Sequence, residues 1–359
     1  MNLNVKWDIT YKCNLNCAHC INGQLLGMTE DELDTIQVLD IIKKLKAAGV
    51  SYVHLLGGEP TARLDFLKII KAFEDENLNF GFNTNGLKLK DVDYLDAIVN
   101  NKAIKNVVCS LEGPTAQIND QIRGKRVFEV TTENIRHLVA NRQKLGRNDL
   151  KVTVNTVVSK NNISYIPRMI SFCQKMGVDE IVLLQFIQEG NGANLSIVPS
   201  ENEVLTLIET IADSYAKYKD KIEISPKFAM PLTKEYVNRV LKKEFPQTYS
   251  LCGAGDKFFY LNNKGELYPC DRYKDRINDL NDKEDINLVK NEFWNVADQP
   301  GFEEIYRYFE NEKNYGTLYP CNDCQYLGEF CCPCPAQKPT GVISLCKRMK
   351  EKIENVSNL

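Results

Sequence analysis

The chain has 359 residues, a formal net charge of −3 and an apolar fraction of 43%, which suit a soluble protein large enough for two domains. The small negative charge gives no basic footprint for nucleic acid, and no apolar run approaches the roughly 20 residues that span a bilayer. The first eight residues alternate polar and apolar side chains and lack the apolar stretch of a signal peptide, so we expect a cytoplasmic protein that binds neither nucleic acid nor membrane.

Strand-like and helix-like segments alternate as far as about residue 190. The periodicity predicts strands over Asn4–Thr10, Val50–Leu56, Phe80–Asn83, Ile104–Leu111, Lys151–Val158 and Glu180–Phe186. It predicts helices from a capping box at Thr29–Glu32 to about Ala48, over Leu64–Asp75, from about Val92, near Thr131–Gln143 and near Tyr165–Met176. Six β/α units in succession predict a parallel sheet with right-handed crossovers, either a flavodoxin-like sheet or a barrel.

The rest of the chain has a different character. We predict a first domain over residues 1–190, a helical bridge over 191–248 and a cysteine-rich domain over 249–359. The chain holds 13 cysteines, three near the start, two in the middle and eight after residue 250. In a cytoplasmic protein this clustering favours metal or redox chemistry over disulfides, whereas Cys109 and Cys173 lie at core positions of a strand and a helix.

The first cluster is Cys13-Asn-Leu-Asn-Cys17-Ala-His-Cys20, a C-x3-C-x2-C run. A cubane [4Fe–4S] cluster normally takes four thiolates, and this run offers three, so that one iron would stay open. Two simpler readings are a zinc site with His19 as a fourth ligand and a set of inert buried thiols.

The spacing resembles the signature of the radical S-adenosylmethionine (SAM) enzymes, and Gly57-Gly58-Glu59-Pro60 after the second strand resembles that family's SAM-binding turn. The resemblance implies a partial (β/α)6 TIM-like barrel with its site at the C-terminal ends of the strands. It also implies that the open iron chelates SAM, and that one electron splits SAM to give a 5′-deoxyadenosyl radical that abstracts a substrate hydrogen. The residues that it places around the cofactor are His19, Gly57, Gly58, Glu59, Pro60, Asn83, Ser110, Arg123, Asn155 and Gln185.

The cysteines after residue 250 resemble the SPASM domain, an auxiliary iron–sulfur module, although paired C-x2-C segments alone would also suit a zinc ribbon. The resemblance implies two further [4Fe–4S] clusters, hence three in all. The ligands implied for the first are Cys252, Cys270 and Cys334, and those for the second are Cys321, Cys324, Cys331 and Cys346. The third position of the second block is displaced by one residue, so Cys331 and Cys332 compete for it. Cys332 either completes the first cluster or leaves that cluster open to a substrate thiol.

The resemblance implies oxidation of a peptide or small protein, with crosslink formation as our first hypothesis and an electron donor such as flavodoxin or ferredoxin. Asp271, directly after Cys270, matches the proposed general base of sulfatase-maturing enzymes and equally suits an Asp that caps a turn. The alternatives are formylglycine formation, peptide epimerisation, dehydrogenation of a small molecule such as an aminoglycoside, and a non-catalytic electron carrier. Because the first strand starts close to Met1, we expect no peptide-binding domain ahead of the barrel.

Overall fold

The computed structural model describes residues 3–246, 253–272, 285–299, 302, 321–326, 331 and 340–357. Its strands form one sheet in the order β7-β6-β5-β4-β3-β2-β1-β8-β9, in which all neighbours are parallel except β8 and β9. The strands are β1 (Leu3–Thr10), β2 (Val50–Gly57), β3 (Asn79–Thr84), β4 (Ile104–Ser110), β5 (Lys151–Val158), β6 (Glu180–Gln185), β7 (Glu223–Pro226), β8 (Phe258–Leu261) and β9 (Leu267–Tyr268).

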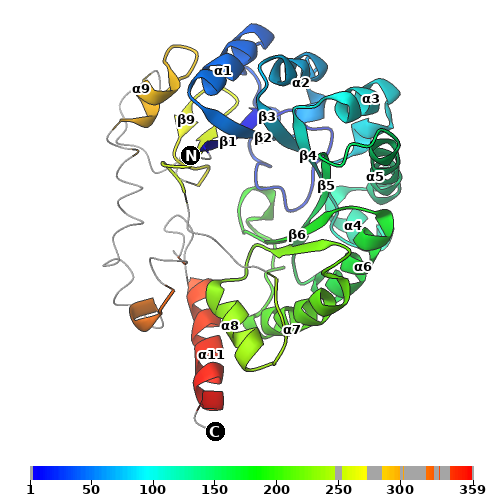
Figure 1. Cartoon of the computed structure of the whole chain (residues 1–359), viewed down its shortest axis with the longest axis vertical. Helices are drawn as coiled ribbons and strands as arrows, with labels where there is room; N and C mark the ends of the chain where they lie inside the picture. Colours follow the sequence, from blue (N-terminus) through cyan, green and yellow to red (C-terminus); the bar gives the residue numbers. More distant parts are fainter. Residues whose placement is uncertain are drawn as a thin grey trace.

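Helices cover the outer face of the curved sheet, which makes a partial TIM barrel (Figure 1). The α-helices are α1 (Thr35–Ala47), α2 (Phe66–Asp75), α3 (Val92–Asn100), α4 (Ala116–Arg123), α5 (Val127–Lys144), α6 (Ile166–Met176), α7 (Glu201–Tyr218), α8 (Pro231–Arg239), α9 (Phe293–Ala297) and α11 (Thr340–Ser357). Short 3₁₀ turns are η1 (Pro60–Ala62), η2 (Leu87–Lys90), η3 (Ile163–Tyr165), η4 (Gly190–Gly192) and η6 (Cys321–Asp323). No described helix is long and apolar enough to cross a membrane.

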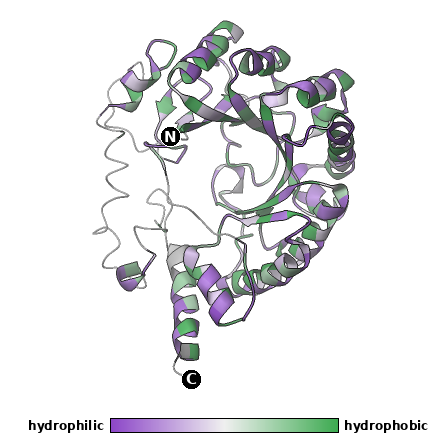
Figure 2. Ribbon diagram, in the orientation of Figure 1, coloured by the Kyte–Doolittle hydropathy of each residue, from purple (hydrophilic) through white to green (hydrophobic). Residues whose placement is uncertain are grey.

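The core lies between the sheet and these helices. Along β2, Val53 and Leu55 are fully buried and face the helices, whereas His54 between them faces the barrel interior. Helix α2 buries Phe66, Ile69 and Phe73 at helical spacing against the sheet. Green and purple residues alternate along the elements in Figure 2, as expected where each element has one buried face. Cys109 and Cys173 are fully buried, which confirms their prediction as core thiols.

The order of the six predicted strands is confirmed, and the sheet continues on both sides of them. β7 pairs with β6 beyond one edge, and β8 pairs in parallel with β1 beyond the other. Helix α4, between the fourth strand and α5, was not predicted.

The predicted capping box at Thr29–Glu32 is wrong, because the first helix begins at Thr35 and Asp34 caps it reciprocally with Gln37. The Glu32 carboxylate instead accepts a hydrogen bond from the Thr10 hydroxyl at 3.0 Å, at the end of β1. The carboxylate of Glu32 thus binds the end of β1. Asp34 and Gln37, which have the same spacing in the sequence, cap the helix instead.

Candidate functional site

The three-cysteine run follows β1 directly, at the C-terminal ends of the parallel strands. Cys17 is buried, and Cys13 and Cys20 are partly buried. Burial raises the pKa of the Cys13 thiol to about 11, and the Cys17 and Cys20 thiols act on it in the same direction. The Cys20 N–H donates to the Cys17 carbonyl at 3.2 Å, so a tight turn holds these two cysteines together. A thiolate in a partly buried site near two other thiols is destabilised by burial and by charge repulsion, unless a cation compensates its charge.

The Gly57–Gly58 turn packs against the chain that leads into this loop. A Cβ at Gly57, whose φ is +124°, would lie 2.1 Å from the carbonyl oxygen of Thr10, and a Cβ at Gly58 would lie 2.3 Å from that of Lys12. The Gly58 N–H donates to Thr10 O at 2.7 Å, and the Glu59 N–H donates to Lys12 O at 2.8 Å. The two glycines are therefore required for the backbone of this turn to touch the start of the cysteine loop.

The Glu59 carboxylate is buried and takes four protein donors. It accepts from the Thr61 N–H at 3.2 Å, the Thr61 hydroxyl at 2.7 Å, the Thr84 hydroxyl at 2.8 Å and the Asn85 N–H at 2.6 Å. Burial raises the pKa of Glu59, and these hydrogen bonds oppose that rise. Glu59 thus ties the end of β2 to the end of β3, and its oxygens serve the fold. Pro60 follows as the first residue of η1.

Asn85 extends this tie to the cysteine loop. Its side-chain amide donates to Asn14 Oδ1 at 2.6 Å, and its carbonyl accepts from the Thr131 hydroxyl of α5 at 2.8 Å. Asn83, at the end of the third strand, was selected from the sequence, and Asn85 was not. A second polar residue at a strand end was the signal that could have found Asn85.

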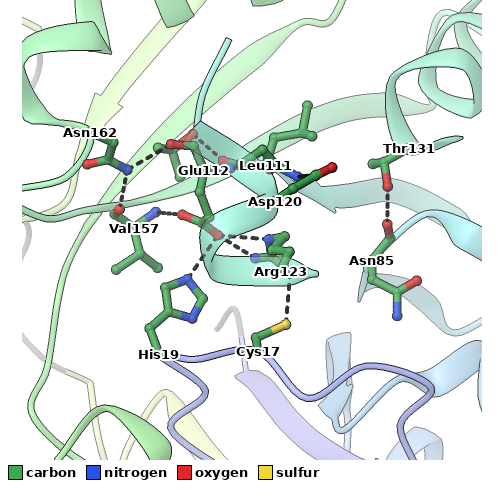
Figure 3. Close-up of polar contacts among 12 residues, drawn as sticks. Cys17, His19, Asn85, Leu111, Glu112, Asp120, Arg123, Thr131, Val157 and Asn162 are labelled. Carbon is green, nitrogen blue, oxygen red and sulfur yellow. Dashed lines mark hydrogen bonds and ion pairs between the residues drawn. The ribbon is translucent and has the colours of Figure 1, made fainter. Parts of the chain in front are cut away.

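A buried ion pair borders the loop on the other side, as Figure 3 shows. Arg123 donates to Glu112 Oε1 through Nε at 2.9 Å, and its Nη1 lies 4.0 Å from Cys17 Sγ. Glu112 also accepts from the Val157 N–H at 2.8 Å. Burial acts to raise the pKa of Glu112, but Arg123 and His19 outweigh it and lower the pKa to about 2. The Arg123 charge likewise opposes the effect of burial on the pKa of the Cys17 thiol.

His19 completes this side of the site. Its Nε2 lies 3.0 Å from Glu112 Oε1, and its Nδ1 is buried without a hydrogen-bond partner in the described part of the chain. A buried polar atom without a partner is unfavourable unless a ligand supplies one. Sequence reasoning selected His19 and Arg123 but left out Glu112, the residue that holds both, although it lies directly after the fourth strand.

Three of the remaining predicted positions lie on the inner face of the sheet. The β4–β5 register places Ser110 beside Asn155, and both are partly exposed. Asn83 Oδ1 lies 2.8 Å from Nε2 of His54, a histidine that sequence reasoning missed, and burial lowers the pKa of His54 to about 4. The neutral imidazole of His54 then donates from Nε2 to Asn83 Oδ1. The amide N–H groups of Asn83 can therefore donate to other partners.

Gln185 does not join this group. The β5–β6 register pairs Asn155 with Val182 and Val158 with Gln185. Alternation along β6 therefore places Gln185 on the opposite face from Asn155, where it is exposed. The predicted grouping of Gln185 with Asn155 is corrected accordingly.

The C-terminal cysteines are described in part. Burial raises the pKa of Cys346 in α11 to about 12, and the thiols of Cys321, in the η6 turn, and of Cys324, directly after it, act in the same direction. Cys270 Sγ accepts from the Arg272 N–H at 3.2 Å, and the Cys331 N–H donates to the Tyr326 carbonyl at 2.8 Å. The structure therefore brings together three of the cysteines predicted for the second auxiliary cluster. Cys252, Cys332 and Cys334 lie outside the described residues.

Asp271 lies in the turn after Cys270. Its carboxylate is 4.0 Å from Nε of Arg272 and is 40% exposed. The role of Asp271 as a general base stays a prediction.

The donor set of the loop is three thiols with the cationic Arg123 beside Cys17, which suits a [4Fe–4S] cluster with one open iron. A structural zinc ion would need a fourth ligand, and the Nε2 atom of His19, the histidine of this loop, already faces the Glu112 carboxylate.

Comparison with known proteins agrees with this geometry. A model of the radical SAM superfamily matches residues 7–173. Mycofactocin maturase MftC of Mycolicibacterium smegmatis is 31% identical over 74% of this chain and 63% of that protein, and MftC of Mycobacterium ulcerans is 30% identical over 74% and 67%. The match thus spans under two thirds of the first of these relatives.

The fold is similar to that of SuiB from Streptococcus suis, which has been solved with SAM and with its precursor peptide SuiA. Both structures give a TM-score of 0.72 at 18% identity, over 97% of this chain and 77% or 76% of SuiB. The superfamily match, the maturase relatives and the barrel with its three-cysteine loop show that this chain belongs to the radical SAM superfamily.

Proposed function

We propose that this chain is a radical SAM enzyme that oxidises a peptide or small protein, with crosslink formation as the preferred outcome. One observation carries the proposal: Cys13, Cys17 and Cys20 gather at the C-terminal end of β1 on a loop that is hydrogen-bonded to the Gly57–Gly58 turn. This places three thiols and a close backbone turn at the edge of the barrel where parallel-sheet enzymes carry their sites.

The cysteine loop would hold a [4Fe–4S] cluster with one open iron for the amine and carboxylate of SAM. When bound, the cluster and SAM supply a hydrogen-abstracting radical. The backbone carbonyls of the Gly57–Gly58 turn are acceptors, which suits the SAM amine, whereas the Gly58 and Glu59 N–H groups already donate to Thr10 and Lys12. Arg123 compensates negative charge near Cys17, and His19 presents an unpartnered nitrogen among the described residues.

The inner face of the barrel would position the rest of SAM and the substrate. Asn83, Ser110 and Asn155 offer hydrogen-bonding side chains there, whereas Gln185 lies on the other face. Glu59 and Pro60 shape the turn, and we assign Glu59 a positioning role because its oxygens already serve four protein donors.

The C-terminal segment would hold two auxiliary [4Fe–4S] clusters. Removing two hydrogens from a substrate takes away one hydrogen atom, one electron and one proton. The auxiliary clusters would accept the electron that the substrate loses, and Asp271 is our candidate to accept the proton. A separate electron, which starts each turnover, would come from an external donor such as flavodoxin or ferredoxin. The ligands that we propose are Cys252, Cys270 and Cys334 for one cluster and Cys321, Cys324, Cys331 and Cys346 for the other, with Cys332 unassigned between them.

A peptide is favoured as the substrate class by the relatives. The two sequence relatives reported above are named as mycofactocin maturases, and SuiB has been solved with a precursor peptide. These names and complexes belong to those proteins, and they support the proposal for this chain by similarity.

Mass spectrometry of a modified peptide tests the proposal. The chain is reconstituted without oxygen and incubated in deuterated water with SAM, dithionite and short peptides encoded beside its gene. We expect a loss of about two daltons per event, because a crosslink removes two hydrogens while the cofactor supplies the radical chemistry. A product with unchanged formula and one solvent deuteron at an α-carbon would mean epimerisation and would contradict the oxidation.

A further inference from the structure

The loop between β6 and α7 lies against the cysteine loop and hydrogen-bonds to it three times. The Asn191 N–H donates to the Cys20 carbonyl at 2.9 Å. The Asn191 side-chain amide donates to the Cys17 carbonyl at 3.1 Å and to Asn16 Oδ1 at 2.8 Å. One residue, about 170 positions along the chain, thus contacts the backbone of two of the three cysteines.

Two glycines make room for this contact. A Cβ at Gly23 would lie 2.2 Å from Cγ of Asn191, so the asparagine side chain occupies the space above Gly23. A Cβ at Gly190, whose φ is +57°, would lie 2.3 Å from the carbonyl oxygens of Cys20 and Ile21. The two loops approach as closely as their backbones allow.

The cysteine loop needs such an external contact because it has little regular structure of its own. Within it, the Cys20 N–H donates to the Cys17 carbonyl at 3.2 Å, and the Gly23 N–H donates to the Cys20 carbonyl at 3.1 Å. Asn191 donates to both of these carbonyls, and so fixes the two points on which the local turns depend. A loop without a helix or strand is otherwise free to sample other spacings of its thiols.

The same β6–α7 loop reaches the C-terminal cysteine segment. The Glu189 carboxylate accepts from Arg272 Nη1 at 2.5 Å, and Arg272 also donates its backbone N–H to Cys270 Sγ. Glu189 and Asn191 are two residues apart in the sequence, so a single loop contacts both cysteine-bearing segments.

We propose that Asn191, seated over Gly23, is a positioning residue that sets the spacing of Cys17 and Cys20, and that its loop joins them to the Cys270 segment. The consequence for SAM binding rests on the proposed function, but the conformational role of Asn191 does not.

A double-mutant cycle on the apo chain tests the conformational role by hydrogen–deuterium exchange of peptides covering residues 11–28. Asn191→Ala removes the two side-chain hydrogen bonds, and Gly23→Ala displaces the asparagine with a new Cβ. We expect each to speed exchange in this segment about tenfold, since each weakens two hydrogen bonds. The double variant should be no faster than either single variant, because an alanine side chain in place of the asparagine leaves nothing for the new methyl group to displace.

Further variants keep this test decisive. Asn191→Asp has the same size but presents an acceptor to the Cys17 carbonyl, so it should also speed exchange. Asn141→Ala serves as the control, because the Asn141 amide makes a solvent-exposed hydrogen bond to the His137 carbonyl of its own helix, far from the cysteine loop in the chain. Unchanged exchange in the Asn191 variants, or additive effects in the double variant, would overturn the proposal.

The reconstituted chain tests the consequence. In Asn191→Ala we expect KM for SAM to rise about tenfold with a smaller change in kcat, and the SAM-induced change in the electron paramagnetic resonance spectrum of the reduced cluster to weaken. An unchanged KM and spectrum in a variant with faster exchange would overturn the link to SAM. If the unaltered chain makes no 5′-deoxyadenosine, the proposed function fails, while the exchange data still decide the role of Asn191.

Discussion

Arg123 and Glu112 form an ion pair that is nine-tenths buried or more, with Nε 2.9 Å from Oε1, and the same guanidinium reaches to 4.0 Å from Cys17 Sγ. The pair joins the end of β4 and the end of α4 to the cysteine loop. Glu112 has a second anchor in the Val157 N–H of β5, so the arginine is held in place from two strands. A fixed positive charge beside a thiol favours the thiolate that a cluster requires.

Glu112→Gln should destabilise the apo chain. The substitution leaves the buried Arg123 charge without its carboxylate, and removing one partner of a buried pair typically costs about 3 kcal/mol or more of unfolding free energy. Urea unfolding followed by circular dichroism measures it. Asp75→Asn, which breaks the exposed Lys71–Asp75 pair, is the control and should leave the midpoint nearly unchanged. Equal midpoints for both variants would show that the Arg123–Glu112 pair does not stabilise the fold.

The stability of the chain in acid should depend on Glu112. Its pKa is lowered to about 2 in the folded state from an ordinary value of about 4.5, so the folded state favours the carboxylate. This contribution is complete above about pH 4.5 and is lost as the pH falls from about 4.5 toward about 2. The difference in unfolding free energy between the unaltered chain and Glu112→Gln should therefore shrink in that window. A difference that stays constant from about pH 6 to about pH 3 would contradict the lowered pKa.

Gly57→Ala should strongly destabilise the chain and prevent cluster assembly, because its Cβ would overlap the Thr10 carbonyl oxygen at 2.1 Å. Gly124→Ala is the matched control: Gly124 has a similar positive φ of +112°, but its Cβ would meet only Val127, at 3.9 Å. The difference in Tm between the two variants separates the overlap from the backbone strain of a strongly positive φ. Similar Tm values would mean that the turn yields without cost, which would refute the close approach.

Cys346→Ala should remove one auxiliary cluster and leave the others. The thiol of Cys346 lies with those of Cys321 and Cys324, so its loss should lower the iron content from about twelve to about eight atoms per chain at four irons per cluster. Iron and sulfide analysis after anaerobic reconstitution measures this. Bound zinc with about four irons in the unaltered chain would refute the auxiliary assignment.

The sequence was sufficient for the β/α order because each buried strand and amphipathic helix has its own periodicity. The cysteine spacing and the Gly57–Gly58 pair were equally visible, since each lies within a few residues. Glu112, Asn85, His54 and Asn191 were missed because their roles depend on contacts between segments far apart in the chain. Asn191, for example, meets Asn16 across 175 positions.

Side-chain direction was the other property that the sequence left open. Gln185 was grouped with Asn155 because both stand near strand ends, but the register of β5 with β6 separates them. The sequence predicts a helix start at Thr29 from the capping-box spacing of Thr29–Glu32, but Glu32 contacts Thr10 and the helix is capped by Asp34 with Gln37. Register and strand-end contacts are tertiary properties, so a single sequence does not determine them.

The central claim is that Cys13, Cys17 and Cys20 create the only site for SAM cleavage in this chain. Production of 5′-deoxyadenosine under dithionite, by the anaerobically reconstituted Cys13→Ala/Cys17→Ala/Cys20→Ala variant beside the unaltered chain, tests it most directly. We predict 5′-deoxyadenosine from the unaltered chain and none from the variant, which should keep about eight irons in its auxiliary clusters. Continued SAM cleavage by the triple variant, or none by the unaltered chain, would contradict the account.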